Sequence, residues 1–143
     1  MSKRINQDTK EIKIKNCDVF ENDFMKLERK EGIVFGTYKK KNITLDMAKE
    51  VVKNRLAFSQ QKDVPTLVTE QGLKGIERDA RQFLGSEEGV KGVKAGAIVT
   101  KSVVSSHLAN FFIRVSIIRT RVPMRLFTSE KEAVKWLKQF LDE

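Results

Sequence analysis

AGAIVTKSVVSSHLANFFIRVSII, residues 95–118, is the stretch that decides the fold, because a strand, a polar turn and a long helix follow one another without a break. Residues 95–100 form a short apolar run, which is typical of a strand buried on both faces of a parallel sheet. The Lys and Ser that follow favour the start of a helix. The stretch therefore predicts a βα unit, and the rest of the chain is expected to cover it.

From about residue 102 the sequence predicts a helix whose apolar residues recur at steps of four and three. They are Val104, Leu108, Phe111, Val115 and Ile118. This spacing places them in one narrow arc, which faces the core. A second apolar row, Ala109, Ile113 and Ile117, lies nearly opposite, where the surface helix of a lone domain should be polar. Two interpretations are open: the row is an interface for self-association or for a partner, or other parts of the domain cover it.

Upstream of this unit the sequence predicts an antiparallel hairpin and a helix. Residues 11–15 alternate as a half-buried edge strand would, and residues 24–29 and 33–39 indicate two strands. Gly32 can adopt the positive φ of the tight turn between them. Thr44 is the expected N-cap of a helix that runs to about Gln61. Its expected buried stripe is Leu45, Ala48, Val52 and Leu56.

Three further segments complete the expected order. Residues 65–69 are β-branched and apolar and indicate a central strand, after which Gly72 and Gly75 mark a turn before a short, interrupted helix. Residues 124–128 indicate another strand, and Ser129 with Glu132 forms a capping box for the last helix. The buried stripe of that helix is expected at Ala133, Leu137, Phe140 and Leu141. The sequence therefore predicts an α/β domain, with a mixed sheet whose N-terminal antiparallel hairpin precedes βαβαβα and whose helices pack on the sheet.

Composition sets the broad class. The 143 residues suffice for one domain, expected over residues 11–143 after a mobile basic tail at 1–10. Cys17 is the only cysteine, which favours a reducing compartment, and no apolar run approaches the roughly 20 residues of a membrane span. A cytoplasmic protein is expected. The net charge of +9 indicates either solubility or an anionic partner such as nucleic acid, and solubility is the favoured interpretation.

No catalytic, metal or cofactor motif stands out. His107 is the only histidine and has no ligand at metal-binding spacing in its own helix, while Gly72 and Gly75 fit no phosphate-binding motif. The chain is therefore expected not to be an enzyme and to need no cofactor. Four arginines lie around the end of the long helix and the next strand: Arg114, Arg119, Arg121 and Arg125. They either bind an anion or complement the negative helix C-terminus, and the second interpretation is favoured.

Four stretches carry a resemblance to a known family: ITLDMAKEVVKNRL, SEEGVK, ANFF and the closing RLFTSEKEAVKWL. With them, the chain from about residue 23 to residue 140 resembles the small SpoIIAA-like, or STAS-like, α/β domains, and most closely an uncharacterised bacterial branch. The resemblance implies a mixed sheet flanked by helices and a non-enzymatic role in protein–protein regulation. Less often, such domains sense ligands. Some relatives of the broad fold resemble lipid carriers, which implies a small apolar ligand as an alternative function.

The classical regulators of this family carry a phosphorylatable serine in a DSSGL-like turn after the central strand. The matching stretch here is Thr69, Glu70, Gln71 and Gly72, so the serines are replaced. A kinase-operated switch at a serine is therefore not expected. Thr69 stays open as a phosphoacceptor, although a structural role at the strand end is the favoured interpretation. We hypothesise instead that Glu70 provides a permanent negative charge at a helix N-terminus. The chain is expected to act as a regulatory or protein-interaction module, for which a homodimer is a possible assembly. The alternative functions are binding of nucleic acid or of an anionic surface, and carriage of a small apolar ligand.

Overall fold

The structure is a computed structural model that describes residues 18–100 and 122–141. Its main sheet has six strands in the order β1-β2-β3-β5-β7-β8. Their bounds are β1 Val19–Glu21, β2 Met25–Lys30, β3 Ile33–Tyr38, β5 Val64–Glu70, β7 Val93–Val99 and β8 Met124–Phe127. β1, β2 and β3 are antiparallel, whereas β3, β5, β7 and β8 run parallel. The predicted mixed α/β sheet is confirmed.

The N-terminal hairpin has the predicted turn. Lys30 pairs with Ile33, so the connection is the two-residue loop Glu31 and Gly32. Both residues have positive φ, 53° and 81°, which is the geometry that matches the twist of a tight hairpin. The edge strand beside this hairpin is β1, which the sequence did not indicate because three residues are too few to show alternation. The strand predicted at residues 11–15 lies outside the described residues.

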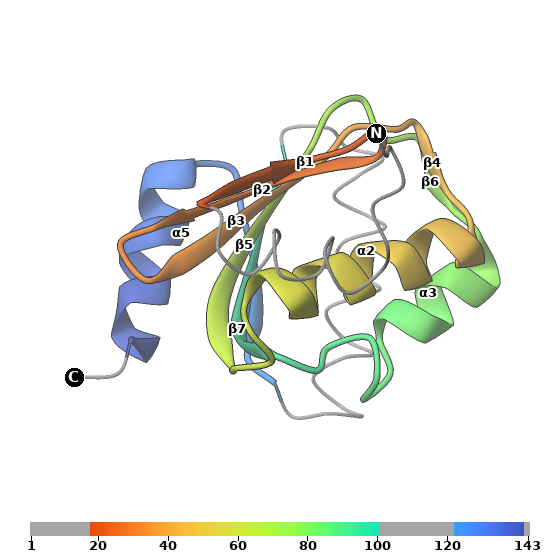
Figure 1. Cartoon of the computed structure of the whole chain (residues 1–143). Helices are drawn as coiled ribbons and strands as arrows, with labels where there is room; N and C mark the ends of the chain where they lie inside the picture. Colours follow the sequence, from red (N-terminus) through yellow and green to blue (C-terminus); the bar gives the residue numbers. More distant parts are fainter. Residues whose placement is uncertain (1–17, 101–121, 142–143) are drawn as a thin grey trace, which may run out of the picture.

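Helices cover both faces of the sheet (Figure 1). α2 (Leu45–Phe58) and α3 (Arg78–Leu84) lie on one side. α5 (Glu130–Leu137) and the short 3-10 helix η1 (Lys138–Phe140) lie on the other. A small parallel pair, β4 (Asn42–Ile43) and β6 (Gly75–Ile76), joins the segments before α2 and α3. The arrangement has helix, sheet and helix layers.

α2 begins as predicted but ends earlier. The Oγ1 of Thr44 accepts a hydrogen bond of 3.2 Å from the backbone N–H of Met47, which confirms Thr44 as the N-cap. The helix ends at Phe58 instead of Gln61, because Gln60 and Gln61 have positive φ values that a helix cannot contain. Of the predicted stripe, Ala48 and Val52 are buried.

The other two members of that stripe, Leu45 and Leu56, are only half-buried. The deep positions toward the C-terminal end of α2 belong instead to Arg55, Ala57 and Phe58. The helix therefore presents a charged side chain to the interior, which the apolar periodicity alone does not show.

The face under α5 is the second core layer. Its buried residues are Ile33, Leu67, Ala95, Ala97, Ala133 and Leu137. Alanines on β7 and α5 let the helix approach the sheet closely. The Oγ of Ser129 accepts a 3.3 Å hydrogen bond from the backbone N–H of Glu132, so the predicted start of this helix is confirmed. The long helix predicted from about residue 102 lies outside the described residues, as does the predicted tail at 1–10.

Candidate functional site: an apolar cavity

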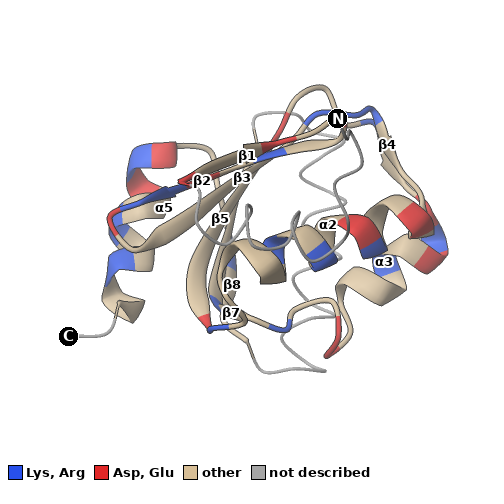
Figure 2. Ribbon diagram, viewed as in Figure 1, with Lys and Arg blue, Asp and Glu red and all other residues tan. Residues whose placement is uncertain are grey.

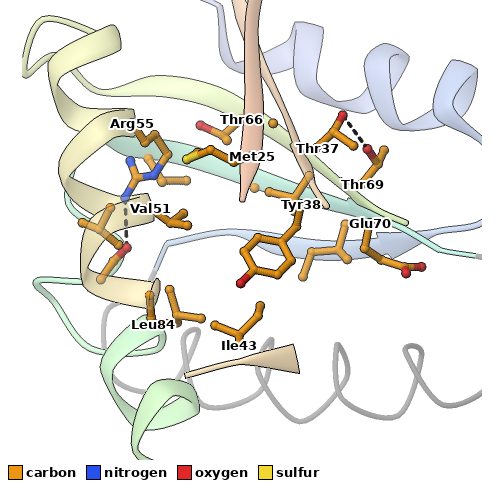
Figure 3. Close-up of a pocket in the computed structure, with 18 of the residues that line it drawn as sticks. Met25, Thr37, Tyr38, Ile43, Val51, Arg55, Thr66, Thr69, Glu70 and Leu84 are labelled. Carbon is orange, nitrogen blue, oxygen red and sulfur yellow. Dashed lines mark hydrogen bonds between the residues drawn. The ribbon is translucent and has the colours of Figure 1, made fainter. Parts of the chain in front are cut away.

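A cavity of about 180 Å³ lies between the sheet and the helices α2 and α3 (Figure 3). Two glycines on this sheet face help to form it. Gly36 on β3 and Gly96 on β7 both line the cavity and carry no side chain to fill it. A Cβ atom at Gly96 would lie only 2.5 Å from the Sδ of Met124, so the Met124 side chain already takes the space beside this glycine. The missing side chains at Gly36 and Gly96 therefore leave room on the sheet face, part of which Met124 fills.

The walls of the cavity are mostly aliphatic. They include Met25, Leu27, Ile43, Val51, Val52, Leu73, Ile76, Leu84, Val90 and Ile98. Val68, on the inner strand β5, also lines the cavity and keeps 37% of its surface exposed. A valine on an inner strand is normally covered on both faces. We interpret Val68 as part of the cavity mouth.

Arg55 lies at one end of the cavity. Its side chain extends from α2 into the interior, and the residue is only 7% exposed. Its Nη1 donates a 2.8 Å hydrogen bond to the carbonyl oxygen of Lys91, and its Nη2 donates a 2.9 Å bond to that of Gly89. Burial lowers the pKa of Arg55 to about 10. The guanidinium is therefore still a cation at neutral pH.

Two glycines allow the loop before β7 to reach Arg55. A Cβ atom at Gly89 would lie 2.1 Å from the carbonyl oxygen of Phe83. Gly92 has a φ of +83°, and a Cβ atom there would lie 2.7 Å from Leu56 and 3.4 Å from the Nη1 of Arg55. Neither position tolerates a side chain, so the loop carbonyls that hold the guanidinium depend on glycine.

Tyr38, at the end of β3, contributes a hydroxyl to the cavity wall. The residue is 6% exposed, and its Oη lies 3.4 Å from the carbonyl oxygen of Asn42 and 3.9 Å from the Sδ of Met47. Both distances are long for hydrogen bonds of a hydroxyl group. Burial raises the pKa of Tyr38 to about 12. The phenol therefore stays protonated at neutral pH and can donate a hydrogen bond.

The predicted switch turn lies at the other end. Figure 3 shows Glu70 on the opposite side of the cavity from Arg55. The Oε1 of Glu70 accepts a 2.7 Å hydrogen bond from the backbone N–H of Leu73, and its Oε2 accepts a 3.0 Å bond from the Oγ1 of Thr100. Its carboxylate therefore ties the turn after β5 to the end of β7. α3 begins only at Arg78, so the structure does not place Glu70 at the N-terminus of that helix.

The four residues of the turn do not share one environment. Thr69 and Glu70 line the cavity, and the Oγ1 of Thr69 donates a 3.1 Å hydrogen bond to the Oγ1 of Thr37. Gln71 and Gly72 are exposed beyond the cavity. Gly72 has a φ of +73° with open space around it, so the turn selects glycine for its backbone conformation.

The other predicted sites are only partly described. Arg125 is exposed on β8, with its Cζ 5.3 Å from the centre of the Phe127 ring. The remaining predicted anion-site residues, Arg114, Arg119 and Arg121, lie outside the described residues. So does the whole predicted interface row: Ala109, Ile113 and Ile117.

The basic residues within the described ranges are interspersed with acidic ones (Figure 2). Both colours occur on α2, α3 and α5 in that view. Lys39, from the triple lysine, forms an ion pair with Glu21 at 2.7 Å, which also lowers the pKa of the Glu21 carboxyl. Nucleic-acid binding stays a prediction that these residues do not test.

The described ranges contain neither a metal-binding cluster nor a membrane-spanning helix. Residues 18–100 and 122–141 contain no group of three or more His, Cys, Asp or Glu side chains arranged to hold a metal ion. In the same ranges, no helix is long and apolar enough to cross a membrane.

The sequence did not reveal Arg55 and Tyr38 as site residues. A signal was present for Arg55, which follows Ala48 and Val52 at helical steps of four and three and therefore lies on the same face. A cation on an apolar stripe requires a partner or an unusual environment. For Tyr38 the only signal was a lone tyrosine at a strand end.

The arrangement of strands and helices defines a class of protein, the domains with a SpoIIAA-like fold. The structure is similar to the crystal structure of an uncharacterised protein from the DUF3478 family with a SpoIIAA-like fold, from Shewanella loihica PV-4, with a TM-score of 0.55. The match covers 82% of this chain and 98% of the other at 17% sequence identity, and it confirms the predicted SpoIIAA-like fold. More particularly, the chain belongs to a domain family of unknown function, DUF7793, which matches residues 25–141. No curated protein matches the chain.

Proposed function

We propose that this chain is a non-enzymatic binding module that holds a small apolar molecule in the cavity between the sheet and the helices α2 and α3. The observation that carries the proposal is the cavity itself, about 180 Å³ of space lined mainly by aliphatic side chains. The aliphatic part of this space is unfavourable for water, because it offers none of the two to four polar partners that a buried water molecule needs.

The cavity volume fits a ligand of modest size. An engineered apolar cavity of about 150 Å³ stays dry and binds benzene or xenon. A cavity of about 180 Å³ therefore suits a molecule of benzene size or slightly larger. The exposed edge of Val68 offers a route by which such a molecule enters.

The titratable groups around the cavity favour binding over catalysis. Glu70 and Arg55 already bond to groups of the fold, and these bonds position their side chains. The pKa of about 12 at Tyr38 is too high for a general base at neutral pH, since an efficient base has a pKa near the working pH. The proposal therefore assigns no reaction to the site.

Binding of toluene tests the proposal. We expect toluene to raise the melting temperature further as its concentration rises, since a ligand held only by the folded state adds about 2.7 kcal/mol at 100 times its Kd. We also expect it to shift methyl NMR signals of residues such as Val51 and Ile98, which line the cavity.

A cavity-filling variant provides the control. Val68→Phe places a ring at the cavity mouth and should abolish the effect of toluene, whereas Val19→Phe makes the same change on the exposed strand β1 and should leave it intact. If toluene shifts neither melting temperature nor cavity methyl signals in the wild type, the proposal is wrong. It is also wrong if an experimental structure shows the cavity filled by the chain itself.

A regulatory role is the second candidate, and it is supported by the position of the turn. Thr69 and Glu70 belong both to the turn that corresponds to the family's switch and to the cavity wall. An occupant of the cavity would therefore touch the surface that the related regulators use for control. Self-association through the Ile113 row is part of this candidate, and sedimentation of wild type against Ile113→Glu/Ile117→Glu tests it. An unchanged monomer would exclude it.

A further inference from the structure

We infer that the molecule held in the cavity is a small monocarboxylate with an apolar body, whose carboxylate binds the guanidinium of Arg55. This inference rests on the proposed function and adds the chemical class of the ligand. It depends on the juxtaposition of a buried cation with an aliphatic cavity.

The charge of Arg55 is not balanced within the described part of the chain. The residue is 7% exposed, and its two hydrogen bonds go to neutral backbone carbonyls. No Asp or Glu in the described ranges forms an ion pair with it. Buried charges in proteins are normally paired, because removal of a charge from water without a counter-ion is costly. An anionic ligand would provide that counter-ion.

The guanidinium also has the donors to bind a carboxylate. An arginine carries five N–H groups, and the bonds to Gly89 and Lys91 use two of them, which leaves three. Carboxylates accept from guanidinium groups in pairs of parallel bonds. The loop carbonyls at the same time fix the direction of the side chain, so the site is preorganised for this group.

The remaining polar groups determine how the ligand is oriented. Glu70 lies at the opposite side of the cavity (Figure 3), and its negative charge disfavours a carboxylate there. The aliphatic walls between the two ends suit a hydrocarbon body. The Tyr38 hydroxyl, protonated and only weakly bonded, provides a single further donor along the wall. Hexanoate and benzoate have the size and the polarity that this arrangement requires.

Calorimetric titration of the full chain tests the inference with three probes of equal length: hexanoate, 1-hexanol and hexylammonium. At neutral pH we expect hexanoate to bind at least tenfold more tightly than 1-hexanol, and hexylammonium to bind most weakly. Two variants then test whether Arg55 is the group that binds the carboxylate. Arg55→Met should remove the preference for hexanoate over 1-hexanol. Arg29→Met should retain it, because Arg29 stacks on Phe58 and does not line the cavity.

The outcomes separate the two proposals. If 1-hexanol binds as tightly as hexanoate in the wild type, the assignment to a carboxylate is wrong while the apolar site stands. If neither hexanoate nor 1-hexanol binds and toluene does not bind either, the proposed function itself is wrong. Arg55→Met removes bonds to the loop and can unfold the chain. The wild-type comparison of hexanoate with 1-hexanol and hexylammonium decides the matter without it.

Discussion

Replacement of Glu70 by alanine tests how the turn after β5 is held. The carboxylate accepts two hydrogen bonds, one from the N–H of Leu73 and one from the Oγ1 of Thr100, which is itself only 3% exposed. Hydrogen bonds to a charged group contribute about 1.5–3 kcal/mol each when well buried. Because Glu70 is half-buried, we expect Glu70→Ala to lower the free energy of unfolding by about 2–3 kcal/mol in total.

Two further variants divide this effect between the bonds. Glu70→Gln keeps the shape of the side chain and an acceptor for Leu73, so we expect a loss below about 1 kcal/mol. Thr100→Val removes only the hydroxyl and should cost about 1 kcal/mol. In a double-mutant cycle, Glu70→Ala and Thr100→Val should show a coupling of about 1 kcal/mol, because they remove the same contact.

Chemical denaturation with urea measures these differences, and thermal unfolding checks them. A loss of 2–3 kcal/mol should lower the melting temperature by about 5–10 °C for a domain of this size. A change below about 0.5 kcal/mol in Glu70→Ala would refute the conclusion that the carboxylate fixes the turn. Additive effects in the cycle would show that Glu70 and Thr100 do not interact in solution.

Three further perturbations test other parts of the structure. Tyr38 is the only tyrosine, so absorbance at 295 nm should show its ionisation near pH 12 in the native chain and near its ordinary value of 10 in denaturant. Because the folded state binds the phenol proton of Tyr38 more tightly than the unfolded state does, the free energy of unfolding should fall as pH rises from 10 to 12. A titration midpoint near pH 10 in the native chain would contradict the burial of Tyr38. Gly32→Ala should lower the free energy of unfolding more than Gly72→Ala does. Both glycines have positive φ, but only at Gly32 would the added Cβ lie 2.8 Å from a side-chain atom of Leu141. Equal losses in urea denaturation would show that the Leu141 side chain moves aside at no cost. Ser129→Ala should cost about 1 kcal/mol by loss of the helix cap, and no change in the urea midpoint would contradict it.

Local chemistry made the order of most elements predictable. The Glu31–Gly32 turn, the Thr44 cap and the Ser129 cap each depend on residues adjacent in sequence, and all three are confirmed. β5, β7 and β8 were predicted from short apolar runs. The strands β1, β4 and β6 were missed, because two or three residues form a strand only when a partner strand is present.

The candidate site was far less predictable. Thr69 and Glu70 were identified through a resemblance to a known family, yet the partner of Glu70 is Thr100, which is 30 residues away in the chain. Arg55 contacts a loop 34 to 36 residues further on. Such pairs form because parallel strands separated by helices are brought side by side, and hydrophobic periodicity contains no information about which polar groups then meet.

The sequence by itself determined the strand at residues 95–100, the hairpin turn and the helix caps, since each depends on spacing or conformational preference within a few residues. Only the tertiary structure decided that Gly36, Gly96 and the aliphatic side chains opposite them line a partly open cavity. It also decided that Arg55 is buried at one end of that volume and Glu70 lies at the other. A cavity is the space that packing leaves unfilled between distant segments, so its existence depends on how closely those segments approach.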